Sequence, residues 1–185
     1  LANVTTGESN IGIGRNAGVS LTEGIRNIYV GHSSGNNTST GTQNVGIGFH
    51  SLYSNTTASN NVAMGHEALK ANTTGSDMTA VGGNAMLTNT TGCRSVAVGN
   101  SALEDNTTGN HNVAIGRMAM RCNTEGVYNT AVGDQALYVN TTGDSNVAVG
   151  ANALDANTTG DNNIAIGRVS LSSNTTADDN TAVGH

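Results

Sequence analysis

The chain has 185 residues, a net charge of −6 at pH 7 and 3% aromatic residues, with 25 glycines and neither proline nor tryptophan. The negative charge argues against a nucleic-acid surface, which needs clustered Lys and Arg, and no apolar run approaches the ~18 residues of a membrane span. So few aromatic residues also argue against the bulky core of a compact globular domain.

A glycine preceded by a β-branched residue or Met recurs every 17 residues along the whole chain. Eleven copies follow one another without insertion or deletion, which is typical of a coil in which each repeat forms one turn and stacks on the next. Because glycine allows a sharp turn, we expect these residues to end each strand. The structural turn glycines are Gly14, Gly31, Gly48, Gly65, Gly82, Gly99, Gly116, Gly133, Gly150, Gly167 and Gly184.

Numbered from this glycine as position 1, the repeat predicts one strand at positions 15 to 17, from residues 11–13 in the first copy to 181–183 in the last. Positions 15 and 17 are mostly Val or Ile, which favour strands, and they share one face. We expect this face to line the interior of the coil and position 16, mostly Ala, to point outward. The predicted core residues are Val113, Ile115, Val147, Val149, Ile164 and Ile166.

The rest of each repeat predicts turns and a second apolar segment. Positions 4 and 5 are Ala or Ser followed mostly by Leu or Met, and Asn-Thr-Thr-Gly at positions 8 to 11 has the composition of a corner. Of the 20 charged residues, 18 fall at positions 2, 3, 6, 7, 12 or 13, which we expect to face water. The Asn at position 14 is expected to stack into a hydrogen-bonded ladder that Met78 and Ser95 interrupt.

The three consecutive apolar positions suggest that both faces of the strand are buried. A small residue at position 16 would allow close approach of a second copy of the chain, and cyclic symmetry would make each copy use the same surface. The alternative is that position 16 is a solvated alanine.

The segments Asn146-Val147-Ala148-Val149-Gly150 and Asn112-Val113-Ala114-Ile115-Gly116 resemble the Asn-x-Val-Ala-Ile-Gly repeats of YadA-like trimeric autotransporter heads. The longer unit, with Ala-Leu and then Asn-Thr-Thr-Gly, is similar to repeats of phage tail fibre proteins. The resemblance covers essentially the whole chain and implies a left-handed parallel β-roll and a homotrimer. Autotransporter repeats are commonly shorter and less regular, so the constant 17-residue spacing favours the tail fibre.

We therefore predict an all-β parallel β-solenoid of eleven 17-residue rungs, left-handed and homotrimeric by resemblance. Residues 1–185 form a single repetitive segment. Because Leu1 and His185 both fall within a repeat and solenoids need capping ends, we expect a fragment of a longer fibre protein.

Few side chains suggest chemistry. Asp144, Asp161 and Asp178 share position 12 in successive copies, so a weakly bound Ca²⁺ is the alternative to a solvated acidic stripe. The five histidines lack zinc-ligand spacing. Cys93 and Cys122 lie two copies apart, which predicts free thiols. Seven Asn-Thr-Thr triplets match glycosylation acceptors, although the repeat itself explains them.

No catalytic or cofactor-binding residue is predicted, and we expect a structural or adhesive protein rather than an enzyme. The first hypothesis is a phage tail fibre segment, on the virion, that spaces and presents surfaces for a host cell-surface glycan or protein. The alternative is the head of a bacterial trimeric autotransporter adhesin, on the extracellular cell surface. A polysaccharide-degrading tailspike and an ice-binding solenoid, suggested by the threonines at positions 9 and 10, are the lower alternatives.

Overall fold

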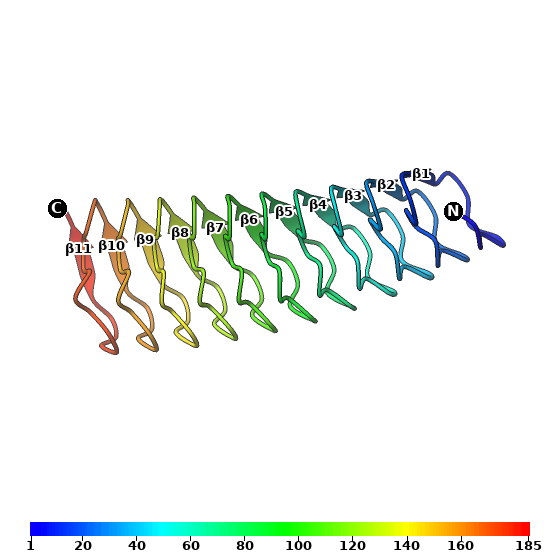
Figure 1. Ribbon diagram of the computed structural model, residues 1–185. Coiled ribbons are helices and arrows are strands. Elements are labelled where there is room, and N and C mark those ends of the chain that lie inside the picture. Colours follow the sequence, from blue (N-terminus) through cyan, green and yellow to red (C-terminus); the bar gives the residue numbers. More distant parts are fainter.

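A computed structural model describes residues 1–185 as one continuous coil with a short strand in each turn and no helix (Figure 1). All eleven strands lie in one parallel sheet, paired in chain order. Each residue of β1 to β10 pairs with the residue 17 positions later, as Val113 pairs with Thr130. The strands are β1 (Ile11–Ile13), β2 (Ile28–Val30), β3 (Val45–Ile47), β4 (Val62–Met64), β5 (Thr79–Val81), β6 (Val96–Val98), β7 (Val113–Ile115), β8 (Thr130–Val132), β9 (Val147–Val149), β10 (Ile164–Ile166) and β11 (Thr181–Val183). The predicted all-β parallel solenoid with 17-residue turns is confirmed.

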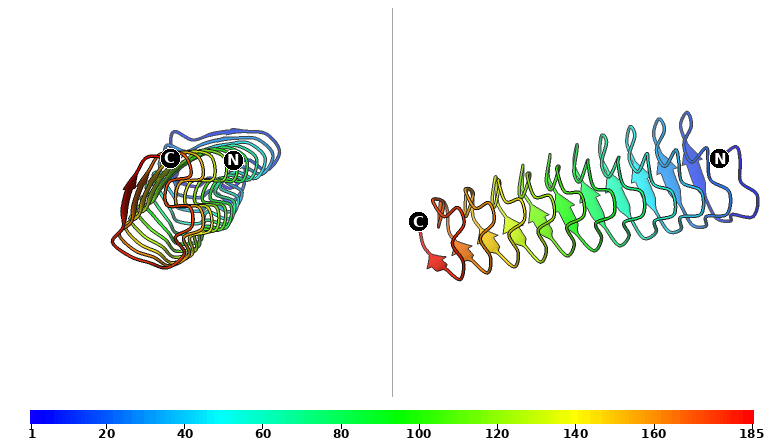
Figure 2. Two further views of the ribbon diagram at one scale, coloured as in Figure 1. Left: turned by 90° about the vertical axis from the view of Figure 1, so that its left-hand side faces the viewer. Right: turned by 90° about the horizontal axis from the view of Figure 1, so that it is seen from below.

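The view along the axis shows that the turns lie nearly on top of one another (Figure 2). The strands line one wall of the coil, and a wavy, irregular stretch of chain forms the wall across from it. Most of the hydrogen bonds that join the turns lie outside the strands, since 103 of the 123 backbone hydrogen bonds fall in the turns and loops. The whole circumference of each turn is therefore fixed to its neighbours, which makes the coil a rod.

The interior of the coil is lined by position 16, which corrects the predicted direction of the strand side chains. Ala114, Ala148 and Ala165 are fully buried at the centres of β7, β9 and β10. The residues on either side of them face outward. The six predicted core residues are therefore wrong as core residues, because Val113 and Val147 are only half-buried and Ile115, Val149, Ile164 and Ile166 are 36 to 40% exposed.

The physical reason is the narrowness of the coil. The opposite wall already contributes the buried Ala or Ser of position 4 and the Leu or Met of position 5. A Cβ placed on Gly46, at position 16, would lie 2.6 Å from Ser34 Oγ on that wall. Since close-packed interiors do not accept extra methyl groups without strain, only a small residue fits at position 16 beside a bulky position 5.

The opposite wall is wavy because its backbone alternates between left-handed and ordinary conformations. In one turn Gly99, Ser101 and Leu103 have φ angles of 138°, 56° and 51°. A left-handed conformation costs a non-glycine residue about 1–2 kcal/mol. The fully buried side chain of Leu103 offsets that cost, because burying a leucine contributes about 1.5–3 kcal/mol.

Candidate functional site

The outer face of the strands is an apolar surface that runs the length of the sheet. It consists of positions 15 and 17, and every residue there is Ile, Val, Met or Thr, with no charged side chain. Met64 and Ile115 are each about 40% exposed in the middle of the coil, where neighbouring turns already cover them from both sides. We call these 22 side chains the outer strand face. Contiguous apolar surface of this extent marks an interaction site on a protein.

The repeat glycines hold the turns close together at the end of each strand. All eleven have φ between 119° and 145°, a region that only glycine adopts readily. A Cβ on Gly133 would also lie 2.6 Å from the carbonyl carbon of Gly150 in the next turn. Glycine is required here both for the backbone conformation and for the close approach of consecutive turns.

Two asparagine ladders run through the interior, one at position 14 as predicted and one at position 8. In the first, Oδ1 of Asn129 accepts from the backbone N–H of Asn146 at 2.9 Å. In the second, Nδ2 of Asn123 donates to Oδ1 of Asn106 at 2.9 Å and to the carbonyl of Gly126 at 3.1 Å. An unpaired buried amide would lower the stability of the fold. Because each amide here is paired with the next turn, the two columns hold the turns in register.

The threonines of position 9 also bond between turns. The hydroxyl of Thr124 donates to the carbonyl of Thr141 at 3.1 Å, and that of Thr141 donates to the carbonyl of Thr158 at 3.0 Å. Only the position-10 threonines remain as an outward column. The ice-binding alternative therefore loses one of the two threonine columns on which it depended.

The three stacked aspartates at position 12 bond the backbone of the preceding turn. Oδ1 of Asp144 accepts from the N–H of Val127 at 2.7 Å, and Oδ1 of Asp161 accepts from that of Asp144 at 2.7 Å. Oδ1 of Asp178 accepts from the N–H of Asp161 at 2.8 Å, and serine or asparagine takes the same role at this position in earlier turns. Backbone donors thus stabilise one oxygen of each carboxylate within the chain. No group of three or more His, Cys, Asp or Glu side chains is arranged to hold a metal ion.

Five aromatic rings, including that of Tyr53, gather near the amino-terminal end of the coil. His32, Phe49 and His66 occupy position 2 in successive turns, and their rings stack at centroid distances of 5.5 and 5.3 Å. His50 packs against Phe49 at 3.8 Å. Because the rings cover one another's faces, this column offers mainly ring edges to a ligand.

The imidazole of His50 lies beside the ion pair of Glu67 and Lys70. Its Nδ1 is buried without a hydrogen-bond partner and lies 3.8 Å from Oε1 of Glu67, which accepts at 2.7 Å from Nζ of Lys70. Burial, followed by the charge of Lys70, lowers the pKa of His50. The neutral imidazole is therefore the favoured form in the folded chain.

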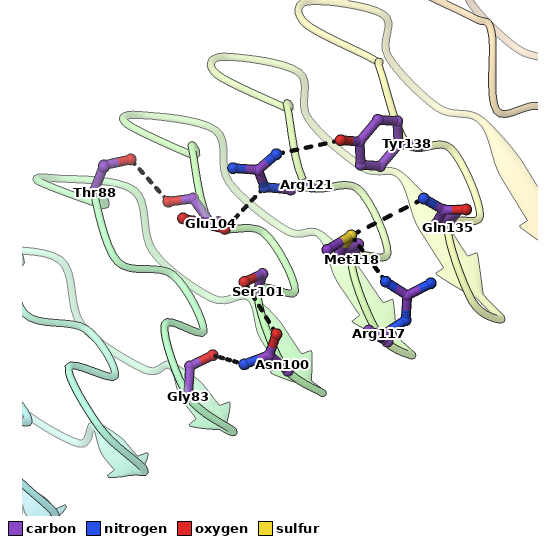
Figure 3. Close-up of polar contacts among 10 residues, drawn as sticks. All are labelled: Gly83, Thr88, Asn100, Ser101, Glu104, Arg117, Met118, Arg121, Gln135 and Tyr138. Atoms are coloured by element: carbon purple, nitrogen blue, oxygen red, sulfur yellow. Dashed lines mark hydrogen bonds and ion pairs between the residues drawn. The ribbon is translucent and has the colours of Figure 1, made fainter.

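A chain of polar contacts crosses three turns at position 6 (Figure 3). Nε of Arg121 donates to Oε2 of Glu104 at 2.9 Å, and Nη1 of Arg121 donates to the hydroxyl oxygen of Tyr138 at 3.2 Å. The hydrogen bond to Glu104, followed by that to Tyr138, raises the pKa of Arg121. Partial burial is the largest single influence on Glu104 and acts to raise its pKa, but the hydrogen bonds from Arg121 and Ser101 and the charge of Arg121 together lower it.

Cys93 and Cys122 are both free and half-buried, as the spacing predicted. Partial burial, with the charge of Asp105 next, raises the pKa of the Cys122 thiol. The asparagines of the seven glycosylation triplets lie in the position-8 ladder, where their Nδ2 atoms donate inside the coil. They are Asn55, Asn72, Asn89, Asn106, Asn140, Asn157 and Asn174. Of these, all but Asn174 are fully buried in the folded chain.

Comparisons with protein-family models, with curated proteins and with solved structures found no match to this chain. No helix long and apolar enough to cross a membrane is present.

The asparagine ladder at position 8 was not predicted from the sequence, and the predicted inward direction of positions 15 and 17 was wrong. A signal for the first was available, because position 8 is Asn in every turn from Asn55 to Asn174 and is never charged. The second had no comparable signal, since alternation along a strand fixes which residues share a face but not which face is inside.

Proposed function

We propose that the chain is a rigid spacer segment of an extracellular attachment fibre, most closely that of a phage tail, and that it assembles with two further copies through the outer strand face. The observation that carries this proposal is the outer strand face itself. A lone coil would leave two columns of mostly β-branched side chains partly in water over eleven consecutive strands. Covering them with identical chains would stabilise the assembly by about 25 cal/mol for each Å² of apolar surface removed from water.

Two features support self-association over association with an unrelated partner. The outer strand face repeats with a constant spacing along the axis, so another copy of the chain matches it in period over its full length. It also carries no charge that would repel an identical surface. The number three rests on the similarity of Asn-Val-Ala-Val-Gly segments such as 146–150 to YadA-like head repeats.

A spacer role, without catalysis, suits the internal bonding. The asparagine and threonine ladders and the backbone hydrogen bonds tie each turn to the next around its whole circumference. Such a rod holds its ends at a fixed separation. The charged, variable positions 2, 3, 6, 7, 12 and 13 lie on the remaining surface and are available for contact with a host.

The head of a bacterial trimeric autotransporter adhesin is the second candidate, favoured by the same five-residue segments. It would use the same outer strand face and the same rod. Neighbouring genes distinguish the two proposals, because a tail fibre is encoded among tail genes whereas an adhesin carries a membrane anchor on its own chain.

The assembly is tested by analytical ultracentrifugation. We expect a mass three times the 18.6 kDa of one chain. The double variant Ile115→Lys and Val149→Lys places charges in the outer strand face and should give the mass of one chain. The control, Thr108→Lys and Thr159→Lys, changes two exposed corner residues and should keep the larger mass. A wild-type chain that sediments at 18.6 kDa across the micromolar range would refute the assembly.

A further inference from the structure

A groove of about 520 Å³ crosses the wall opposite the strands, near the carboxy-terminal end of the coil. It arises from a decrease in side-chain size along position 6, where Tyr138 is followed by Asp155 and then by Ser172. Val139 and Ala156 lie beside them at position 7 and give the groove an apolar side. The groove is shallow and open to solvent, so a ligand would contact it on one side only.

The aromatic ring at one end of this groove is held in place before any ligand arrives. The hydroxyl oxygen of Tyr138 accepts a hydrogen bond from Arg121, and Glu104 fixes Arg121 from the other side (Figure 3). This chain of contacts leads away from the groove, toward the preceding turns. A ring that is already oriented loses little freedom on binding, which favours affinity.

Hydrogen-bonding groups lie on the groove next to that ring. Nδ2 of Asn152 donates to Oδ2 of Asp155 at 3.3 Å and to Oε1 of Gln135 at 3.3 Å. The one hydrogen bond to the Asp155 carboxylate goes to Oδ2, and Ser172 lines the same groove. A carboxylate oxygen and an amide oxygen side by side can accept hydrogen bonds from two neighbouring hydroxyl groups.

We propose that this groove binds a neutral pyranose, with one C–H face of the sugar on the Tyr138 ring and two adjacent hydroxyls on Asp155 and Asn152. An aromatic face beside acceptors of this kind suits a sugar, which is apolar on its ring faces and polar at its edge. The carboxylate of Asp155 and the net charge of −6 disfavour acidic sugars. The inference deepens the proposed attachment function, on which it rests, by giving the host ligand a chemical class.

The position of the groove is compatible with the proposed assembly. Positions 6 and 7 directly follow positions 4 and 5, which meet the strand across the interior, so they lie away from the outer strand face. Each copy in an assembly joined through the strands would therefore keep its groove in contact with solvent. Several weak sugar contacts on one particle give a strong attachment by avidity.

The probes are the methyl α-glycosides of glucose, galactose and mannose, and binding is measured by saturation-transfer NMR on the assembled protein. We expect transfer to the protons of one sugar face for at least one glycoside. Tyr138→Ala and Ser172→Tyr should each weaken binding at least tenfold. Ser172→Tyr fills the groove while placing at position 6 a residue that the column already holds at Tyr53 and Tyr138. The matched control, Tyr53→Ala, removes a position-6 tyrosine five turns away and should leave binding unchanged.

Absence of transfer from all three glycosides, or equal transfer in wild type, Tyr138→Ala and Ser172→Tyr, would overturn the groove proposal. Sedimentation of the same samples separates this result from the proposed function. A chain that assembles but binds no glycoside contradicts the groove alone, whereas a monomer that binds a glycoside contradicts the assembly alone.

Discussion

The ring of Tyr29 fills the space that a side chain on Gly35 would need. A Cβ placed on Gly35 would lie 2.5 Å from Cδ1 of Tyr29. Tyr29 stands at position 16, where most turns have Ala, and Gly35 stands at position 5, where most turns have Leu. The hydroxyl of Tyr29 donates to Oγ1 of Thr38 at 3.0 Å, where later turns have Asn, and burial raises the pKa of Tyr29 to about 12. One large residue and its neighbours have therefore changed together while the interior volume stays filled.

This exchange predicts a strong coupling between the two positions. Tyr29→Ala should lower the free energy of unfolding by about 3–5 kcal/mol, because it leaves a cavity. Gly35→Leu alone should also destabilise the chain, by overpacking. The double variant should recover at least about 1 kcal/mol of the summed loss, since it recreates the common pair. Chemical denaturation of the four proteins measures this, and strictly additive losses would show that the two sites are independent.

The direction of the strand side chains predicts unequal effects for two adjacent substitutions. Val113→Thr changes the outer strand face and should cost less than Ala114→Val, because Thr79 and Thr130 already occupy position 15 there. Ala114→Val adds two methyl groups to a fully buried site and should cost about 1–3 kcal/mol. Thermal unfolding of both variants tests the order. A larger loss of stability for Val113→Thr than for Ala114→Val would support the original prediction that positions 15 and 17 line the interior.

The gap in the position-14 ladder predicts a stabilising substitution. Asn61 Oδ1 accepts from the N–H of Met78 at 3.1 Å, but Met78 offers no oxygen to the N–H of Ser95 in the next turn. Met78→Asn should supply that acceptor and raise the free energy of unfolding by about 1 kcal/mol. Met86→Asn is the control, because it buries an amide at position 5, outside either ladder, and should destabilise the chain. A fall in melting temperature for Met78→Asn would contradict the prediction.

His50 predicts a loss of stability in mild acid. Its pKa is lower in the folded chain than in the unfolded chain, so the unfolded chain binds more protons as the pH falls through the ordinary histidine range. Stability contributed by neutral His50 is therefore present above pH 6.5 and decreases below it. Glu67, whose pKa is lowered by Lys70, stays ionised in this window, and His32 and His66 add like charges when protonated.

The test is the melting temperature measured from pH 7.5 to pH 5.5. His50→Asn should reduce the slope over this range, and Asn suits the left-handed backbone there, as Asn84 and Asn152 show at the same position. His111→Asn is the matched control, because it removes a histidine that stacks on Tyr128 outside the cluster around His50. An identical slope for wild type and His50→Asn would assign the pH response to other groups.

The sequence alone determined the periodicity and everything that follows directly from it. Equal spacing of the glycines fixed one turn per 17 residues, the parallel pairing of each residue with its equivalent, and the columns in which Asn129 bonds Asn146. These features are local or repetitive, so they do not depend on which side of the strand is covered. The sequence also shows that Tyr29 and Gly35 depart from the repeat, but only the structure shows that the ring of Tyr29 fills the space beside Gly35.

Only the tertiary structure decided which face of each strand is inside. Val113 and Ala114 alternate in either arrangement, and hydrophobicity alone favoured the larger residue for the interior. The distance between the two walls determined the outcome, because Leu103 and its equivalents come from the opposite wall and leave room for only a methyl group on the strand. That volume is a property of two segments packed together, which a pattern along one segment does not contain.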